Sequence, residues 1–256
     1  MKILSIANFK GGTGKTVTAV NLAALLAREG KRVLLIDADA QHNATDFFID
    51  DASEETTLTE LLTGEGEACW EYYVTPTGRE GLCMVCADMG LLRLDLNAIL
   101  NGSEAGRMRL ADFLGAIEMD DGFDYVLIDC PPSFTAASVA ALCNSQEVII
   151  PTRLDAFSRQ GALELIDQIQ SMGRRIAGLR YRVLITMAGT RDRLSKEAEA
   201  LIRQCHLYET FDTVIHAGVK AGESTWERLP LYEYAPCCRT AKDYEALLRE
   251  VLADGT

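Results

Sequence analysis

Basic residues are scarce in this chain of 256 residues, where 25 Lys and Arg stand against 38 Asp and Glu and leave a net charge of −13 at pH 7. This balance excludes a globally basic nucleic-acid binder, because Lys and Arg supply most of the non-specific attraction to phosphate. Apolar runs of roughly 20 residues, which a membrane-spanning helix needs, are missing as well. The first residues also lack the pattern of a signal peptide. We therefore expect a cytoplasmic, globular protein, and the length favours a single domain over 1–256.

The eight cysteines do not form a short, loop-rich disulfide framework but are scattered through apolar sequence. This usage favours a reducing compartment, with most of the cysteines serving as small core residues. Cys83 and Cys86 have the spacing of a metal-binding pair, but no second pair follows at the spacing of a zinc site, and the alternation around them favours a strand. We therefore expect no metal site built from cysteine.

Short apolar runs alternate with stretches of helical periodicity along the chain. Strands are expected at 2–7, 32–36, 125–128, 147–150 and 182–186, and helices at 16–28, 136–143, 158–172, 195–205 and 240–252. The expected strands are continuously apolar, as in parallel strands that are buried on both faces. The pattern predicts an α/β fold, namely a doubly wound, mostly parallel sheet with helices on both faces.

A glycine-rich loop lies between the first expected strand and the first expected helix. It reads Lys10, Gly11, Gly12, Thr13, Gly14, Lys15 and Thr16, followed by Val17. In such a loop the backbone N–H groups and the helix N-terminus face an anion, a lysine reaches the β and γ phosphates, and a threonine hydroxyl holds Mg²⁺. The ordinary Walker A pattern places glycine where this chain has Phe9. The loop therefore predicts a nucleotide phosphate site of a variant type.

Acidic residues follow two of the expected strands. Asp129 ends the apolar run 125–128, and a carboxylate at the carboxyl edge of a parallel strand beside a phosphate loop suits a Walker B role in holding Mg²⁺. Asp37 and Asp39 end another run, where alternation points both side chains the same way. One of them could orient the attacking water in phosphoryl transfer. The alternative for this pair is a helix cap or a solvated turn.

These segments together resemble the deviant Walker A ATPases of the ParA/MinD class. The likeness rests on the loop at 10–16, on Leu35-Ile36-Asp37-Ala38-Asp39-Ala40-Gln41 and on Asp129-Cys130-Pro131-Pro132-Ser133, and it covers nearly the whole chain. Residues 41–45, 211–215 and 232–234 resemble the ParA/Soj branch, which segregates plasmids and chromosomes. The resemblance implies a P-loop ATPase that uses ATP and Mg²⁺ and forms a homodimer in its ATP state.

The resemblance also implies roles for single residues. Lys10 matches the signature lysine that reaches across the dimer to the partner's nucleotide, and Gly11 matches the glycine of close approach at that interface. Asp39 matches the residue of hydrolysis and is expected near the metal. The phosphate and magnesium roles fall to Lys15, Thr16 and Asp129. A cation delivered by the other subunit stabilises charge in the transition state and couples hydrolysis to dimer formation.

Some positions depart from the pattern of the family. Ala40 and His42 replace the proline and glycine that commonly flank the switch glutamine, and Val17 stands at the threonine-rich start of the first helix. Around Ile215, His216-Ala217-Gly218 replaces Pro-Arg-Asn, and Lys220 replaces the arginine that follows. We interpret His216 as a surface substitution rather than as a ligand.

Charge is segregated along the chain, which bears on DNA binding. Ten carboxylates and no Lys or Arg occur at 37–67, whereas six Arg and one Asp occur at 174–193. We expect DNA contacts from Arg191 and Arg193, with Lys220 near them in the resemblance. The alternative is that the basic run is a solvated face or binds a partner protein.

The function that we expect is an ATP-dependent, dimerising switch for DNA partitioning, bound to non-specific duplex DNA as the ATP dimer and released by hydrolysis. No helix-turn-helix segment precedes the loop, so a ParB-like partner protein is expected to read the centromere and stimulate hydrolysis. A MinD-like membrane switch needs a basic amphipathic C-terminal helix, but 245–256 has one Arg and three acids, and we expect no membrane binding. A nucleotide-bound scaffold without hydrolysis is a third possibility.

Overall fold

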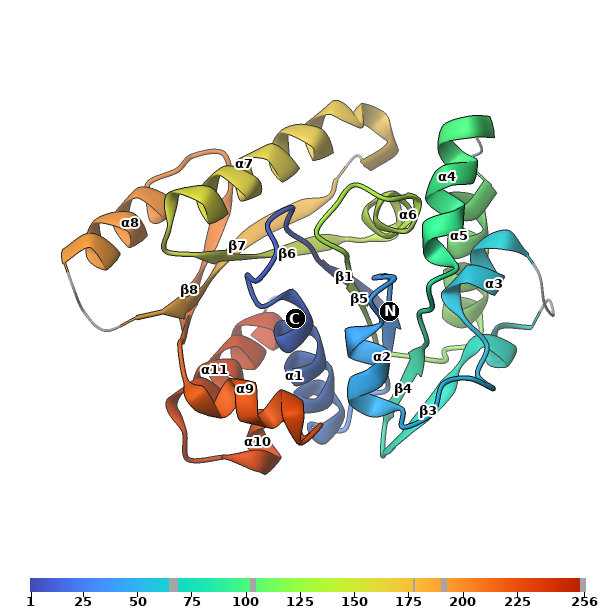
Figure 1. Ribbon diagram of the computed structural model, residues 1–256, viewed down its shortest axis with the longest axis horizontal. Coiled ribbons are helices and arrows are strands. Elements are labelled where there is room, and N and C mark those ends of the chain that lie inside the picture. The colour runs from blue at the N-terminus through green and yellow to red at the C-terminus, as the bar shows by residue number, and fades with distance from the viewer. Residues whose placement is uncertain (65–68, 102–104, 177, 190–192, 254–256) are drawn as a thin grey trace.

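A computed structural model describes residues 1–64, 69–101, 105–176, 178–189 and 193–253. One eight-stranded sheet, in the order β3-β4-β2-β5-β1-β6-β7-β8, runs through this part of the chain (Figure 1). Its strands are β1 (Lys2–Ile6), β2 (Val33–Asp37), β3 (Thr75–Arg79), β4 (Leu82–Val85), β5 (Tyr125–Asp129), β6 (Glu147–Arg153), β7 (Arg180–Ala188) and β8 (Glu209–His216). Neighbouring strands are parallel except for the hairpin of β3 and β4.

Helices cover both faces of the sheet, so the expected doubly wound fold is confirmed. One face carries α1 (Lys15–Arg28), α2 (Asn43–Phe48), α9 (Val219–Trp226), α10 (Leu231–Tyr234) and α11 (Arg239–Ala253). The other face carries α3 (Leu58–Thr63), α4 (Leu91–Asn101), α5 (Ala105–Met119), α6 (Ala136–Asn144), α7 (Ala156–Ser171) and α8 (Arg193–Arg203). Two short 3-10 turns are η1 (Trp70–Tyr73) and η2 (Gly173–Ile176).

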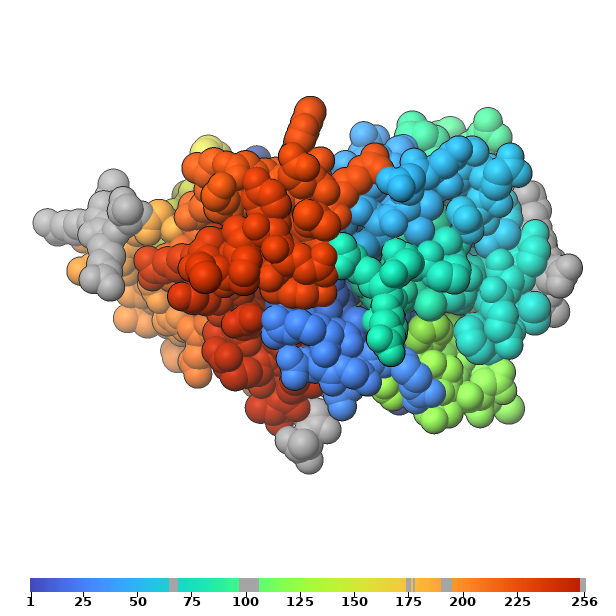
Figure 2. All heavy atoms as spheres, turned by 90° about the horizontal axis from the view of Figure 1, so that it is seen from below, coloured from blue at the N-terminus to red at the C-terminus, as the bar shows by residue number. Residues whose placement is uncertain are grey.

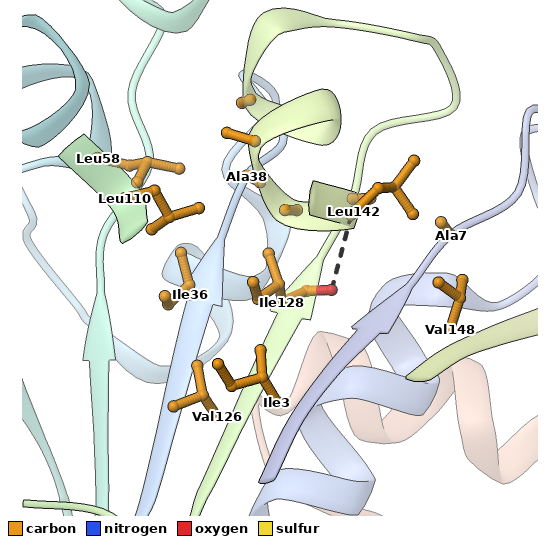
Figure 3. Close-up of a cluster of buried hydrophobic side chains, with 14 of the residues drawn as sticks. Ile3, Ala7, Ile36, Ala38, Leu58, Leu110, Val126, Ile128, Leu142 and Val148 are labelled. Atoms are coloured by element: carbon orange, nitrogen blue, oxygen red, sulfur yellow. Dashed lines mark hydrogen bonds between the residues drawn. The ribbon is translucent and has the colours of Figure 1, made fainter. Parts of the chain in front are cut away.

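The central strands are buried on both faces, which explains their continuous apolar sequence. All residues of β2 and β5 are buried, and alternate side chains enter two separate cores. Ile36 and Ile128 belong to the core beneath α5 and α6, which Figure 3 shows, whereas Leu35 and Leu127 belong to the core beneath α1 and α11. Each core buries aliphatic side chains, and their removal from water is the main force that holds the layers together.

The strand order reverses around β1, which lies between β5 and β6. At such a switch point the loops after adjacent strands diverge to opposite faces and leave a crevice at the carboxyl edge of the sheet. The loop at 7–14 and the acidic ends of β2 and β5 all lie at this edge. The fold thus brings together the three segments that the sequence singled out.

The strand expected at Cys83 is present, but only Cys86 and Cys130 of the eight cysteines are buried, so the prediction that most of them are core residues is wrong. Cys83 lies in β4, Cys86 follows it in the core, and all eight cysteines are free thiols. The described residues contain no group of three or more His, Cys, Asp or Glu arranged to hold a metal ion. None of the described helices has the length and apolar character that a bilayer crossing requires.

Candidate nucleotide site

The glycine-rich loop has a backbone that only glycine adopts without strain. Gly12 and Gly14 have φ of +71° and +88°, in the left-handed region. Gly14 precedes α1, and no side chain caps this helix end. The first N–H groups of an α-helix have no partner within the helix, so an uncapped N-terminus binds anions readily. Side chains added at Gly11 and Gly12 would meet only open space, as expected for a loop that faces a ligand.

Two residues that sequence reasoning missed brace this loop from neighbouring strands. The buried Asn8 side chain accepts a hydrogen bond from Lys10 N at 2.9 Å and donates one to the carbonyl oxygen of Pro151 in β6 at 2.8 Å. The Thr186 hydroxyl in β7 donates to the carbonyl oxygen of Thr13 at 2.7 Å. These buried hydrogen bonds hold the loop against the sheet. The only signal in the sequence was a polar residue next to or inside an apolar run.

Lys15 enters the site from the first turn of α1. Its side chain is largely buried, and Nζ donates to the carbonyl oxygen of Lys10 at 3.3 Å. Burial lowers the pKa of Lys15, and the charges of Asp129 and Asp39 oppose that shift. A buried ammonium with a single main-chain acceptor gains from an anionic partner, so this lysine fits a phosphate-binding role.

Asp129 ends β5 with a carboxylate that the surrounding protein does not satisfy. The residue is 1% exposed, and neither carboxylate oxygen has a hydrogen-bond partner in the described part of the chain. Burial raises the pKa of Asp129 well above its usual range, and the charge of Asp37 adds to this, while the nearby Thr16 hydroxyl and Lys15 ammonium oppose it. An orphaned buried carboxylate beside a hydroxyl fits the oxygen ligands that Mg²⁺ prefers.

Asp37 and Asp39 differ in role: the carboxylate of Asp37 is bonded within the structure, whereas that of Asp39 is partly exposed. Asp37 is buried and accepts hydrogen bonds from the Thr45 N–H at 2.8 Å, the Thr45 hydroxyl at 2.9 Å and Asp39 N at 3.1 Å. Burial raises the pKa of Asp37 to about 6 despite these donors. Asp39 is partly exposed, and its Oδ1 accepts from Gln41 N at 3.0 Å. One oxygen of Asp39 thus stabilises a turn, as in the alternative interpretation. The carboxylate of Asp37 connects α2 to the sheet through Thr45.

Lys10 lies on the outer side of the loop. It is exposed, and its Nζ lies 5.6 Å from the centre of the Phe157 ring at the start of α7. Its main chain therefore faces inward to Lys15 and Asn8, while its side chain extends to the surface. Phe157 was not singled out from the sequence, because an isolated aromatic residue in an amphipathic helix carries no distinguishing signal.

A groove of about 370 Å³ continues from the phosphate loop between α1, α2 and α9. It is lined by Thr16, Val17, Val20, Asn43, Asp46, Phe47, Thr225 and Arg228. A larger groove of about 760 Å³ lies at the opposite end of α1, where Arg28 and Lys31 meet the β3–β4 hairpin and Tyr232. Figure 2 shows this side of the molecule, with the blue end of α1 between the teal hairpin and the orange and red C-terminal helices. The arginines Arg28, Arg32 and Arg79 of this second groove all pair with carboxylates.

Of the three residues expected to contact DNA, the structure describes the side chain of Lys220. Arg191 lies outside the described residues, and Arg193 begins α8 without a described side chain. Lys220 is exposed on α9, where its Nζ donates to Glu223 Oε2 at 2.6 Å. Two of the six arginines at 174–193 have described acidic partners. Arg182 is buried against Glu147, and Arg180 pairs with Glu209.

His216 ends β8 and is tied to α11. Its Nδ1 lies 2.9 Å from Asp243 Oδ2, and Arg239 donates to its Nε2 at 2.6 Å. This pairing corresponds to the neutral imidazole with its proton on Nδ1. The ring is partly buried rather than a free surface group, and both of its nitrogens are occupied by protein groups. The expectation of a surface substitution is therefore met only in part, and that His216 is not a ligand stays a prediction.

The fold and this site together define a P-loop ATPase of the α/β class. Residues 1–179 match the family described as AAA domain. The chromosome partitioning protein ParA of Caulobacter vibrioides is 35% identical over 257 residues, which cover 99% of this chain and 94% of that protein. The sporulation initiation inhibitor protein Soj of Bacillus subtilis is 32% identical over 99% of both chains. The chain therefore belongs to the ParA/Soj family of partition ATPases.

Solved structures agree with this assignment. Apo McdA of Cyanothece has a TM-score of 0.86 at 25% identity and matches 98% of this chain and 99% of its own. The cell division ATPase MinD of Pyrococcus furiosus has a TM-score of 0.77 at 23% identity, with 98% of both chains covered. The second likeness shows a shared fold. The chain is thus an ATPase of a family whose curated members include chromosome partitioning proteins.

Proposed function

We propose that this ATPase is a dimerising switch for DNA partitioning, which binds non-specific duplex DNA as the ATP dimer and is released by hydrolysis. The single observation that carries the nucleotide switch is the orphaned carboxylate of Asp129 beside the uncapped start of α1. A buried acid without a donor and a helix end without a cap both call for a bound group of opposite charge. The cargo would be a plasmid, a chromosome or a mobile element, and the printed names of the ParA and Soj relatives support the chromosome.

Residues 10–17 would bind the phosphates of ATP, with Lys15 supplying the charge that faces the β and γ phosphates. Thr16 and Asp129 would hold Mg²⁺ directly or through its water, with Asp39 near it. When bound, Mg²⁺ neutralises charge on the phosphate oxygens. The hydrogen bonds of Asn8 and Thr186 keep the loop in place, so its N–H groups need no rearrangement when the charge of the transition state develops.

Hydrolysis would depend on Asp39 and Lys10. Asp39 uses one carboxylate oxygen in its turn, at Gln41 N, and its partly exposed side chain is placed to orient the attacking water. Lys10 extends outward, so we assign it to the nucleotide of the second copy rather than to its own, with Gly11 allowing the two loops to approach. Turnover would then require the dimer.

DNA contact would come from Arg191, Arg193 and Lys220, doubled in the dimer. A ParB-like protein, or another activator, would carry the cargo and stimulate hydrolysis. The proposed setting is the cytoplasm, with the ATP dimer on the nucleoid and no membrane contact. Residues 1–256 would act as one ATPase unit. These proposals rest on the relatives and on the position of Lys220, which sits on an exposed helix.

The decisive experiment measures binding to random-sequence duplex DNA with ATP, with ADP and without nucleotide, at two salt concentrations. The wild type is compared with the Arg191→Glu/Arg193→Glu double variant and with Lys31→Gln, whose lysine lies at the opposite end of α1. We expect binding that needs ATP, weakens steeply with salt and disappears only in the double variant. If the wild-type protein dimerises with ATP but does not bind DNA at low salt, the proposed role in DNA binding is overturned.

A second candidate is a positioning ATPase that acts on a protein or membrane platform without DNA. This candidate is favoured by the ion pairs of Arg180, Arg182 and Lys220 with glutamates. A basic side chain that is already paired with an acid is less available to a DNA phosphate. The likeness to McdA and MinD is compatible with this function. ATP-dependent dimers that fail to bind DNA in the experiment above would support it.

A further inference from the structure

The backbone of Lys10 packs unusually closely against the first turns of α7. A Cβ atom added to Gly161 would lie 3.0 Å from Asn8 Oδ1, 3.2 Å from Lys10 Cβ and 3.3 Å from Lys10 N. Such distances are tighter than ordinary van der Waals contact, so glycine is what lets the helix approach the loop. The same Asn8 Oδ1 accepts the hydrogen bond from Lys10 N. The main chain of the signature lysine is therefore fixed against α7.

The side chain of Lys10 meets the same face of this helix. Phe157 and Gly161 are four residues apart and therefore lie on one side of α7. The Phe157 ring is 76% exposed, and Lys10 Nζ lies 5.6 Å from its centre, within the range of a cation–π contact. A side chain exposed to this extent is not part of a hydrophobic core. The ring of Phe157 is therefore accessible to the ammonium of Lys10.

The first turn of α7 is built to hold that ring in place. Asp155 caps the helix, because its side chain accepts from Ser158 N at 2.8 Å and from the Ser158 hydroxyl at 2.9 Å. The Asp155 carboxylate is engaged further by Arg153, with Nε at 3.4 Å. Phe157 lies inside this capped turn. The Asp155 carboxylate is thus occupied, and the described contact between α7 and the ammonium of Lys10 is the Phe157 ring.

We propose that Phe157 is a positioning residue, which holds the ammonium of Lys10 at the surface and directs it toward the nucleotide of a second copy of this chain. This inference rests on the proposed ATP dimer. A lysine side chain is flexible, and ordering it before the partner arrives reduces the entropic cost of association. Gly161 supplies the close approach, and the ring supplies an acceptor for the cation that does not form a competing salt bridge.

The interaction of Lys10 with Phe157 can be observed directly in the nucleotide-free protein. Lysines are reductively methylated with ¹³C, which keeps their charge, and the Lys10 signal is assigned with Lys10→Arg. We expect the aromatic ring to shift the Lys10 signal in the wild type and in Phe157→Tyr. In Phe157→Leu the signal should remain, but its ring-current shift should be lost. The matched control is Phe134→Leu, because Phe134 is also exposed but packs on Phe9 rather than on Lys10. A Lys10 signal that is unshifted in the wild type overturns the proposal.

Turnover provides the second measurement. An exposed cation–π interaction biases a side chain only modestly, so Phe157→Leu is expected to lower kcat roughly two- to five-fold and to leave KM for ATP unchanged. Phe157→Tyr, which keeps the aromatic ring, should retain the kcat of the wild type. An equal decrease in Phe134→Leu, or a change in KM rather than kcat, would show a general packing role instead. Failure of the wild type to dimerise with ATP would reject the proposed function, whereas the shift of Lys10 is measured without nucleotide and tests the interaction with Phe157 by itself.

Discussion

The phosphate loop and the basic stretch around β7 contrast in how their charges are satisfied. Asp129 is buried without a donor, and Lys15 is buried with one main-chain acceptor. Arg182, which is equally buried, pairs with Glu147 and stacks on Phe211 with its guanidinium carbon 3.8 Å from the ring centre. The first region lacks a hydrogen-bond donor for its buried carboxylate in the described part of the chain, whereas Arg180 and Arg182 of the second have carboxylate partners within the chain. A buried carboxylate without a donor at the end of a strand therefore says more about a bound cation than these two arginines say about a bound anion.

The contrast is tested most strongly at Lys15. We expect Lys15→Gln to reduce ATP turnover by about 100- to 1,000-fold, because it removes a preorganised charge from a site that excludes water. Phosphate release and nucleotide affinity are the measurements. Lys31→Gln removes the same charge at the far end of α1 and should change neither. Comparable decreases in both variants would contradict a specific phosphate role for Lys15.

A somewhat smaller effect is expected at Asp39. Asp39→Ala should lower turnover by about 100-fold while ATP still binds, since positioning of water contributes to the chemical step and not to ground-state affinity. Phosphate release is measured beside the binding of a fluorescent ATP analogue. Equal and negligible rates in the variant and the wild type would favour the nucleotide-bound scaffold that lacks hydrolysis.

Asp129 allows stability and function to be separated. Because its carboxylate is buried and has no hydrogen-bond partner in the described part of the chain, Asp129→Asn should stabilise the nucleotide-free protein by about 1 kcal/mol, or roughly 2–4 °C in Tm. The same variant should lack the rise in Tm that the wild type shows with ATP and Mg²⁺. Thermal unfolding with ATP, with and without EDTA, measures both effects. A destabilised variant that keeps the Mg²⁺-dependent rise would show that Asp129 is a structural residue.

Much of the fold could be predicted because its signals are local. The loop between β1 and α1 was placed to within a residue, since an apolar run, three glycines and a helical period adjoin there. The strand β8 was not predicted, because its residues alternate irregularly between buried and exposed positions at the sheet edge. The alternation around Cys83 indicated a strand where β4 lies, but β3 and the helices α2 to α5 were not predicted.

The braces of the site could not be predicted, since they join residues that are distant in sequence. Asn8 and Pro151 are separated by 143 positions, and Thr186 and Thr13 by 173. The ion pair of Arg182 within the basic run could not be predicted for the same reason. Arg182 meets Glu147 only because β6 and β7 pair in parallel, a register that no local pattern reveals. Residue types thus indicate the chemistry, while the partners that complete or cancel it depend on topology.

The smallest expected effect is that of Lys220→Gln on DNA affinity, because the charge of Lys220 is already paired with an acid. Lys220 already pairs with Glu223, which also accepts from the Tyr234 hydroxyl at 2.7 Å. DNA must compete with this pair, and exposed pairs are weak, so Lys220→Gln should weaken ATP-dependent DNA binding by no more than about five-fold. The slope of affinity against salt should fall by about 0.9 for each phosphate that the variant no longer neutralises.

The acidic partner of Lys220 supplies the opposite test. Glu223→Gln should tighten ATP-dependent DNA binding, because it frees the ammonium of Lys220 from its ion pair. Affinities are measured by fluorescence anisotropy at several salt concentrations, with Glu54→Gln, at an exposed position, as the control for the same change in net charge. If Glu223→Gln weakens binding as much as Lys220→Gln does, the pair acts by holding α9 in place and Lys220 does not contact phosphate.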